Sequence, residues 1–160
     1  MYLRANKNIG IMDYSLENIK IWKQLFPDTK TRHVPFLPKI DEGRIPKLCL
    51  KPDYDESTSI LKPVVFIGDA QSKHRSELLT KLQDDVHCLT ATFGVERDAQ
   101  LRQFPILLNV HFGPSYTVFE EIRVLPAILR KQIVVSETSL IDPNHPIFPF
   151  VVFAPYDRLE

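Results

Sequence analysis

The chain has few cysteines, no excess of either charge and no long apolar segment, and each absence excludes a class of protein. Cys49 and Cys88 are too few for a disulfide framework, so we expect a reducing, cytoplasmic location. The 20 basic and 20 acidic residues cancel, and no basic stripe indicates a nucleic-acid partner. No apolar run approaches the ~18 residues of a membrane span. The first residues, MYLRANKN, lack the apolar core of a signal peptide.

Several motifs that carry chemistry are also missing. The chain has no G-x-G-x-x-G fingerprint, no phosphate-binding loop with lysine and serine, and no G-x-S-x-G nucleophile turn. No pair of carboxylates has the pattern of a glycosidase. The histidines and the two cysteines lack metal-ligand spacing, so we expect no metal and no resident cofactor.

The composition is that of an ordinary globular protein, with 44% apolar and 25% charged residues, and its pattern changes near residue 62. Before that point, Ser15 can cap an amphipathic helix over Ser15–Phe26, and His33–Leu37 is predicted to be extended. Four prolines and an acidic run over 38–63 indicate a connecting segment. We therefore predict two parts, 1–62 and 63–160. We also predict that the N-terminal helix packs on the second part or on another chain, because its apolar face is large.

From residue 63 the pattern alternates between strands and helices, which predicts an α/β fold with a parallel sheet and helices on both faces. Right-handed crossovers should join the strands. Helices are expected after Ser72, from about Val95 to Gln103 and from about Thr117 to Lys131, and Pro126 should kink the last of them. Buried apolar runs predict strands at Val64–Ile67, Val86–Thr90, Ile106–Val110, Ile133–Ser136 and Phe150–Phe153.

Polar residues gather where these strands end, and ligands of parallel α/β folds bind at the carboxyl ends of strands. The predicted helix would begin near Gly113–Thr117, where free N–H groups favour an anion; an ordinary loop and helix cap is the alternative. Gly68 follows the first strand of this part, as a phosphate-facing turn would. Arg75 points either toward the same crevice or into solvent. Glu120 and Arg123 are spaced for an i, i+3 ion pair.

The stretches NVHF, FEEIR and VVSE, spaced as they are over 109–137, resemble the nucleotide-sugar-binding C-terminal half of GT-B glycosyltransferases, in a flavour found in bacterial and viral proteins. DYSLEN (13–18), HVPF (33–36) and VVFIG (64–68) with Arg75 agree with it, so the resemblance covers most of the chain. It implies that 63–160 is a Rossmann-like donor-binding domain. Residues 1–62 would be a remnant of the join to an acceptor half, which would normally supply the catalytic base.

The resemblance implies a metal-independent site for a nucleoside-diphosphate sugar, which would be the substrate, with catalytic residues that the sequence does not identify. Arg123 would be the main charged contact to the diphosphate. Asn109 and His111 would line the site, although both are equally consistent with core residues. The donor-binding residues would be Gly68, Asn109, His111, Ser115, Tyr116, Glu120, Arg123 and Glu137.

One residue departs from the pattern. Many GT-B enzymes hold the donor ribose with a glutamate at the position that Pro126 occupies here, and Glu120 or Glu137 would have to replace it. We therefore keep three hypotheses. The first is a glycosyltransferase-like donor domain, completed by a homo-oligomer or a separate acceptor-binding chain. The second is a non-catalytic remnant that serves as a binding or interaction module. The third is a nucleotide-binding α/β domain of unrelated chemistry.

Overall fold

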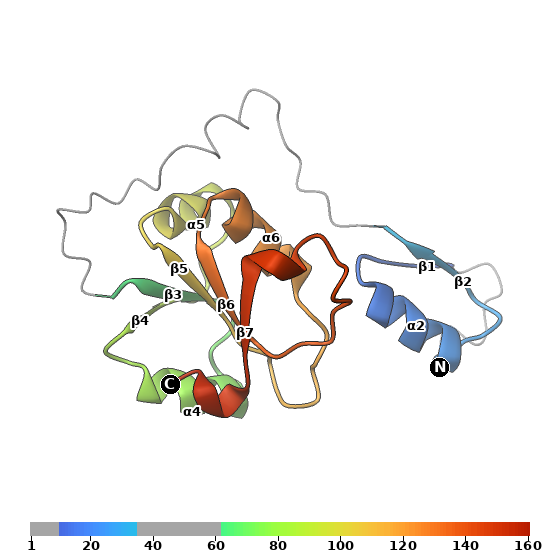
Figure 1. Ribbon diagram of the computed structural model, residues 1–160, viewed down its shortest axis with the longest axis horizontal. Coiled ribbons are helices and arrows are strands. Elements are labelled where there is room, and N and C mark those ends of the chain that lie inside the picture. Colours follow the sequence, from blue (N-terminus) through green and yellow to red (C-terminus); the bar gives the residue numbers. More distant parts are fainter. Residues whose placement is uncertain (1–9, 35–61) are drawn as a thin grey trace, which may run out of the picture. The chain divides into compact units, whose positions relative to one another are not determined.

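The computed structural model describes residues 10–34 and 62–160 (Figure 1). The chain divides into two compact units, and the division falls within 35–61, outside the described residues. The predicted boundary at 62 falls instead at the start of the second described range, and most of the predicted connecting segment lies within 35–61. So does the part of the His33–Leu37 strand beyond Val34.

The first unit is a small β–α–β element. Strand β1 (Gly10–Asp13) pairs in parallel with β2 (Lys30–His33), in register from Gly10↔Lys30 to Asp13↔His33. Helix α2 (Leu16–Leu25) connects them, and the Ser15 hydroxyl accepts a hydrogen bond from Asn18 N at its start. The predicted helix and its cap are confirmed. Strand β1 was not predicted, and the packing partner proposed for α2 stays a prediction.

Asp13 joins the parts of this unit. Its Oδ1 accepts hydrogen bonds from Ser15 N at 2.9 Å and Asn18 Nδ2 at 3.2 Å, and its Oδ2 accepts one from Trp22 Nε1 at 3.3 Å. The D-Y-S-x-x-N stretch therefore has a local structural role, because its Asp, Ser and Asn tie the end of β1 to the first turns of α2.

We expect Asp13→Ala to destabilise this unit by about 2 kcal/mol, because three hydrogen bonds to a charged acceptor are lost together. Trp22 is the only tryptophan of the chain, so its fluorescence during urea unfolding reports on this unit. The control is Asp28→Ala, since Asp28 is exposed after α2. Equal midpoints for the two variants would contradict the role given to Asp13.

The second unit contains a five-stranded, fully parallel sheet in the order β4-β3-β5-β6-β7, which confirms the predicted α/β class and Rossmann-like arrangement. Each predicted strand is present with bounds that differ by a residue or so. They are β3 (Val64–Ile67), β4 (Val86–Leu89), β5 (Ile106–Asn109), β6 (Ile133–Glu137) and β7 (Val151–Ala154).

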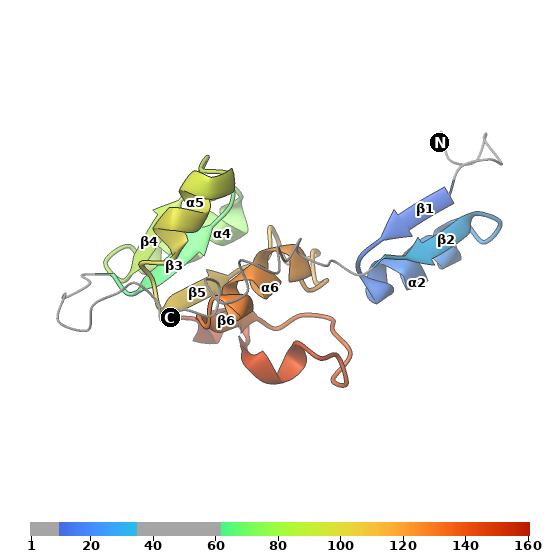
Figure 2. The ribbon, with the colours of Figure 1, turned by 90° about the horizontal axis from the view of Figure 1, so that it is seen from above.

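Helices cover both faces of this sheet, as predicted (Figure 1). Helix α4 (Lys73–Lys81), capped by Ser72, and the short 3-10 helix η2 (Tyr156–Arg158) pack on one face around Phe66 and Leu108. Helices α5 (Gly94–Leu101) and α6 (Glu121–Leu129) pack on the other face around Val65 and Leu107. Figure 2 shows α5 over β3 and β4, and α6 over β5 and β6. A second 3-10 helix, η1 (Phe148–Phe150), precedes β7.

The strand order places the expected ligand site. The chain runs outward from β3 to β4, then crosses back past β3 to β5, and continues outward through β6 and β7. The direction therefore reverses between β3 and β5. In doubly wound sheets, ligands bind outside the carboxyl ends of the strands at such a switch point.

The predicted start of the last helix is wrong. Helix α6 begins at Glu121, because the residues before it are held in extended pairing. Val118 forms a parallel bridge with Leu140, and Leu140 N donates to Thr117 O at 2.6 Å. The apolar residues there fit a helix or an extended segment equally well, and a tertiary contact decides between them. The helix continues through Pro126 to Leu129.

Candidate functional site

Gly68 lies directly after β3, in the switch-point region, and two arginine side chains approach it closely. Its φ of +131° is a backbone conformation that L side chains rarely adopt. A Cβ added there would lie 3.2 Å from Arg123 Nη2 and 3.7 Å from Arg75 Nη1. The predicted turn therefore brings the backbone against two guanidinium groups, which is a suitable surrounding for an anion.

Arg75 from α4 fills the crevice between β3 and β5, in agreement with the first of its two predicted placements. It is only 3% exposed. Its Nε donates to the carbonyl oxygens of Val110 and His111 at 3.0 and 3.2 Å, and its Nη1 donates to that of Asp69 at 3.0 Å. Burial lowers the pKa of its guanidinium, and Glu120, 3.6 Å from Nη2, partly offsets this. Arg75 therefore joins the loops that follow the two strands.

Arg123, Asn109 and Glu120 lie next to this crevice, as predicted. Arg123 Nη1 donates to Asn109 Oδ1 at 2.9 Å and also bonds Glu120, so the expected i, i+3 pair is present. Asn109 is fully buried, and its Nδ2 donates to Ser136 Oγ at 3.0 Å. The Asn109 amide thereby orients Arg123 from the end of β5.

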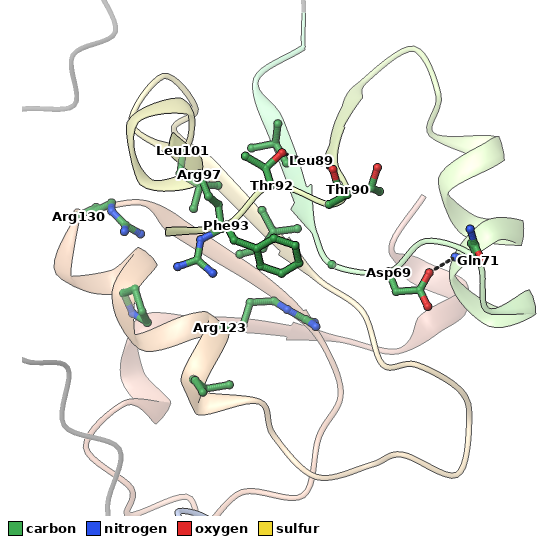
Figure 3. Close-up of a pocket in the computed structure, with 15 residues that line it drawn as sticks. Asp69, Gln71, Leu89, Thr90, Thr92, Phe93, Arg97, Leu101, Arg123 and Arg130 are labelled. Atoms are coloured by element: carbon green, nitrogen blue, oxygen red, sulfur yellow. Dashed lines mark hydrogen bonds between the residues drawn. The ribbon is translucent and has the colours of Figure 1, made fainter. Parts of the chain in front are cut away.

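A cavity of about 740 Å³ opens beside Gly68, over the carboxyl ends of β3 and β4 (Figure 3). Three arginines line it, Arg97 from α5 with Arg123 and Arg130 from α6 and its C-terminal end. Asp69 is the one acidic side chain among the described lining residues, and the loop Thr90–Phe93 forms the wall beyond β4. The positive charge and the position of this cavity suit an anionic ligand.

Glu137 and His111, which are buried, and His74, which is half-buried, form a separate cluster that does not line this cavity. His74 Nε2 lies 3.0 Å from both carboxylate oxygens of Glu137, and His111 N donates to Glu137 Oε2 at 3.0 Å. The His74 ring stacks on Tyr156 with centroids 4.0 Å apart. These contacts tie α4 and η2 to the ends of β5 and β6.

Ser115 and Tyr116 lie on an exposed loop and do not line the cavity either. Tyr116 N donates to Gly113 O at 2.9 Å, which closes a turn, and the Tyr116 ring meets Phe112 edge to face. The helix N-terminus expected at Gly113–Thr117 is at Glu121, after a carboxylate at Glu120 that forms no side-chain cap. This corrects the anion site proposed for that loop.

Of the eight predicted donor-binding residues, Gly68 and Arg123 line the cavity, Asn109 and Glu120 contact Arg123, and the other four lie elsewhere. The sequence reasoning missed Arg97, Arg130 and Phe93. Their positions in the sequence could have identified them. Phe93 and Arg97 follow the second predicted strand, and Arg130 follows the helix that carries Arg123.

The fold and cavity define a doubly wound α/β domain with an arginine-lined pocket at its strand ends. Two similar curated proteins are uncharacterized proteins of Acanthamoeba polyphaga mimivirus. Protein R358 is 32% identical over 97% of this chain and 51% of its own length, and protein L140 is 28% identical over 96% and 49%. The chain thus spans about half the length of these relatives. No family model and no solved structure matches the chain.

Within 10–34 and 62–160, no group of three or more His, Cys, Asp or Glu side chains is placed to hold a metal ion. None of the helices in these same ranges is long and apolar enough to cross a membrane.

Proposed function

We propose that the cavity binds a nucleoside-diphosphate sugar, and that 62–160 is the donor-binding domain of a glycosyltransferase-like protein. One observation carries this proposal: three arginines surround a cavity at the carboxyl ends of β3 and β4, beside the glycine turn that follows β3. The resemblance of the NVHF, FEEIR and VVSE stretches to GT-B donor domains supports it independently.

Size and charge support a phosphorylated ligand. Pockets for small ligands and cofactors have volumes of roughly 300–1,000 Å³, and this one has about 740 Å³. Arginine can grip a phosphate with two parallel N–H bonds, which lysine cannot do. Arg123 is the best placed for this role, because Asn109 orients its guanidinium close to the Gly68 backbone.

The ribose needs a hydrogen-bond acceptor, and Pro126 lines the cavity where the resemblance leads one to expect a glutamate. Glu137 is engaged by His74 and His111 away from the cavity, and Glu120 is engaged by Arg123. Asp69 is the acidic residue that remains in the wall, and its Oδ1 already accepts a hydrogen bond from Gln71 N. Its second carboxylate oxygen is our candidate to hold the ribose.

A binding module without catalysis is the second candidate function, and a specific observation favours it. The ionisable groups best suited to act as a base bond within their own cluster and do not line the cavity; they are His74, His111 and Glu137. Both functions would bind the same ligand. They differ in whether the bond between the sugar and the diphosphate is broken.

The test is calorimetric titration of the full chain with uridine diphosphate, guanosine diphosphate and their glucose or mannose esters. We expect at least one to bind with a dissociation constant below about 1 mM, or −4.1 kcal/mol. Assaying the same mixtures for free nucleoside diphosphate separates the two functions. If a sugar ester binds but forms no free nucleoside diphosphate, with or without a panel of sugar acceptors, the binding module is favoured. No binding of any of these ligands at millimolar concentration would refute both.

A further inference from the structure

A second cationic cluster lies in the cavity wall, away from Gly68. Arg97 and Arg130 share a single carboxylate oxygen, since Asp98 Oδ1 lies 3.2 Å from Arg97 Nη2 and 2.8 Å from Arg130 Nη2. Two guanidinium groups and one carboxylate leave this cluster with a formal charge of +1. Figure 3 shows Arg130 and Arg97 on one side of the cavity and Asp69 with Gln71 on the other.

Arg130 is the buried member of this cluster. It is 8% exposed, and its buried Nε has no hydrogen-bond partner among the described residues. Burial lowers the pKa of its guanidinium, and Asp98 partly offsets this effect. A buried donor without a partner is costly, so a nearby ligand oxygen that reached this guanidinium would recover the lost bond.

The cluster beside Gly68, formed by Arg75, Arg123 and Glu120, also contains two arginines and one carboxylate. Arg75 and Arg123 both approach Glu120, which again leaves two guanidinium groups on one carboxylate. The region of the cavity therefore has two clusters that each set two guanidinium groups against one shared carboxylate, one beside Gly68, where Asp69 also lines the wall, and one between α5 and α6. The diphosphate of a nucleoside-diphosphate sugar carries two negative charges, one on each phosphate.

We propose that Arg97, Asp98 and Arg130 form a second anion subsite, which binds one phosphate of a diphosphate whose other phosphate lies at Arg123. This inference rests on the proposed function for the identity of the ligand, but not for the existence of the subsite. The two clusters together would make the site prefer a diphosphate to a single phosphate, because a diphosphate contacts both clusters and a single phosphate contacts only one.

Inorganic pyrophosphate and inorganic phosphate are the probes, because they carry the anionic groups without a base or a sugar. The full chain would be titrated with each, and with uridine-diphosphate glucose, at one fixed ionic strength. The variants are Arg97→Gln and Arg130→Gln, and Arg130→Lys keeps the charge without the planar fork. The control is Arg158→Gln, which removes a charge from an exposed residue of η2 that does not line the cavity.

We expect Arg97→Gln and Arg130→Gln each to weaken pyrophosphate and nucleotide-sugar binding about tenfold, while phosphate binding at Arg123 changes little. Arg158→Gln should behave as the parent. Arg97 is partly exposed, so its variant keeps the test valid even if Arg130→Gln proves unstable. Melting temperatures identify any variant that has lost its fold.

The outcomes separate this inference from the proposed function. If the nucleotide sugar binds and the Arg97 and Arg130 variants bind it as tightly as the parent, the subsite is wrong and the proposed function stands. If pyrophosphate binds in an Arg97-dependent way and no nucleotide binds, the subsite stands and the proposed function fails. If neither pyrophosphate nor nucleotide binds, both are wrong.

Discussion

Replacing Arg75 with methionine is expected to destabilise the 62–160 unit by about 3–5 kcal/mol, the cost of removing one partner from a buried ionic network. Methionine keeps much of the side-chain volume but supplies no donor. The carbonyl oxygens of Asp69, Val110 and His111 would each lose the donor that Arg75 provides. Glu120 would lose one of its two arginines. The loops after β3 and β5 would then lose the side chain that joins them.

Urea unfolding followed by far-ultraviolet circular dichroism measures this change, because the helices of this unit dominate the signal. A loss of this size corresponds to a fall in melting temperature of about 15 °C or more for a domain of this length. Arg102→Met is the matched control, since Arg102 is exposed. Arg75→Lys should fall between the two, because lysine keeps the charge but cannot reach all three carbonyl oxygens in one plane. An Arg75→Met variant within 1 kcal/mol of Arg102→Met would contradict the proposed role.

The centre of the sheet could be predicted from the sequence because β3 and β5 are buried on both faces. Such strands appear as short continuous apolar runs, and Val64–Ile67 and Ile106–Asn109 are clear examples. The helix starts at Ser15 and Ser72 were predictable for another local reason, since each hydroxyl accepts a hydrogen bond from a backbone N–H three residues later. Local signals of this kind need no knowledge of the tertiary fold.

The start of α6 could not be predicted in this way. The bridge between Val118 and Leu140 joins residues that are far apart in the sequence, and it holds in extended form a segment that also fits a helix. The error moved the expected anion site to the exposed loop with Ser115 and Tyr116. The true helix start carries Glu120, whose carboxylate pairs with two arginines.

Residues of the site could be predicted only where a single strand and the segment that directly follows it in the chain place them. The role given to Arg123 came from the resemblance to GT-B donor domains. Gly68 and Asn109 follow from their positions at strand ends. Arg97 and Arg130 do not, because they share Asp98 across two helices that become neighbours only when the chain crosses back over the sheet. Glu137 lies at a strand end as expected, but His74 from α4 reaches it, and no sequence pattern links these two residues.

Replacing Arg123 with alanine is expected to weaken binding of a nucleoside diphosphate about 100-fold, which corresponds to 2–3 kcal/mol for a partly buried, charge-assisted contact. Arg123 lines the cavity, and its Nη2 is the group nearest to a Cβ placed on Gly68. Its loss removes the cation closest to the glycine turn. It also leaves Asn109 Oδ1 without this donor, so the folding of the variant must be checked by urea unfolding.

Glu120→Ala tests the same guanidinium in the opposite direction, because it removes the carboxylate that pairs with Arg123. Removing this carboxylate takes away an anion that pairs with both Arg75 and Arg123, so a bound diphosphate no longer competes with it for their donors. We therefore expect Glu120→Ala to bind uridine or guanosine diphosphate at least as tightly as the parent, and Arg158→Ala, at an exposed site in η2, to bind as the parent does. Equal binding by Arg123→Ala and the parent would show that the phosphate contact lies elsewhere. Weaker binding by Glu120→Ala would instead mean that this carboxylate is needed to orient Arg123, because loss of a competing anion cannot by itself lower affinity for a phosphate.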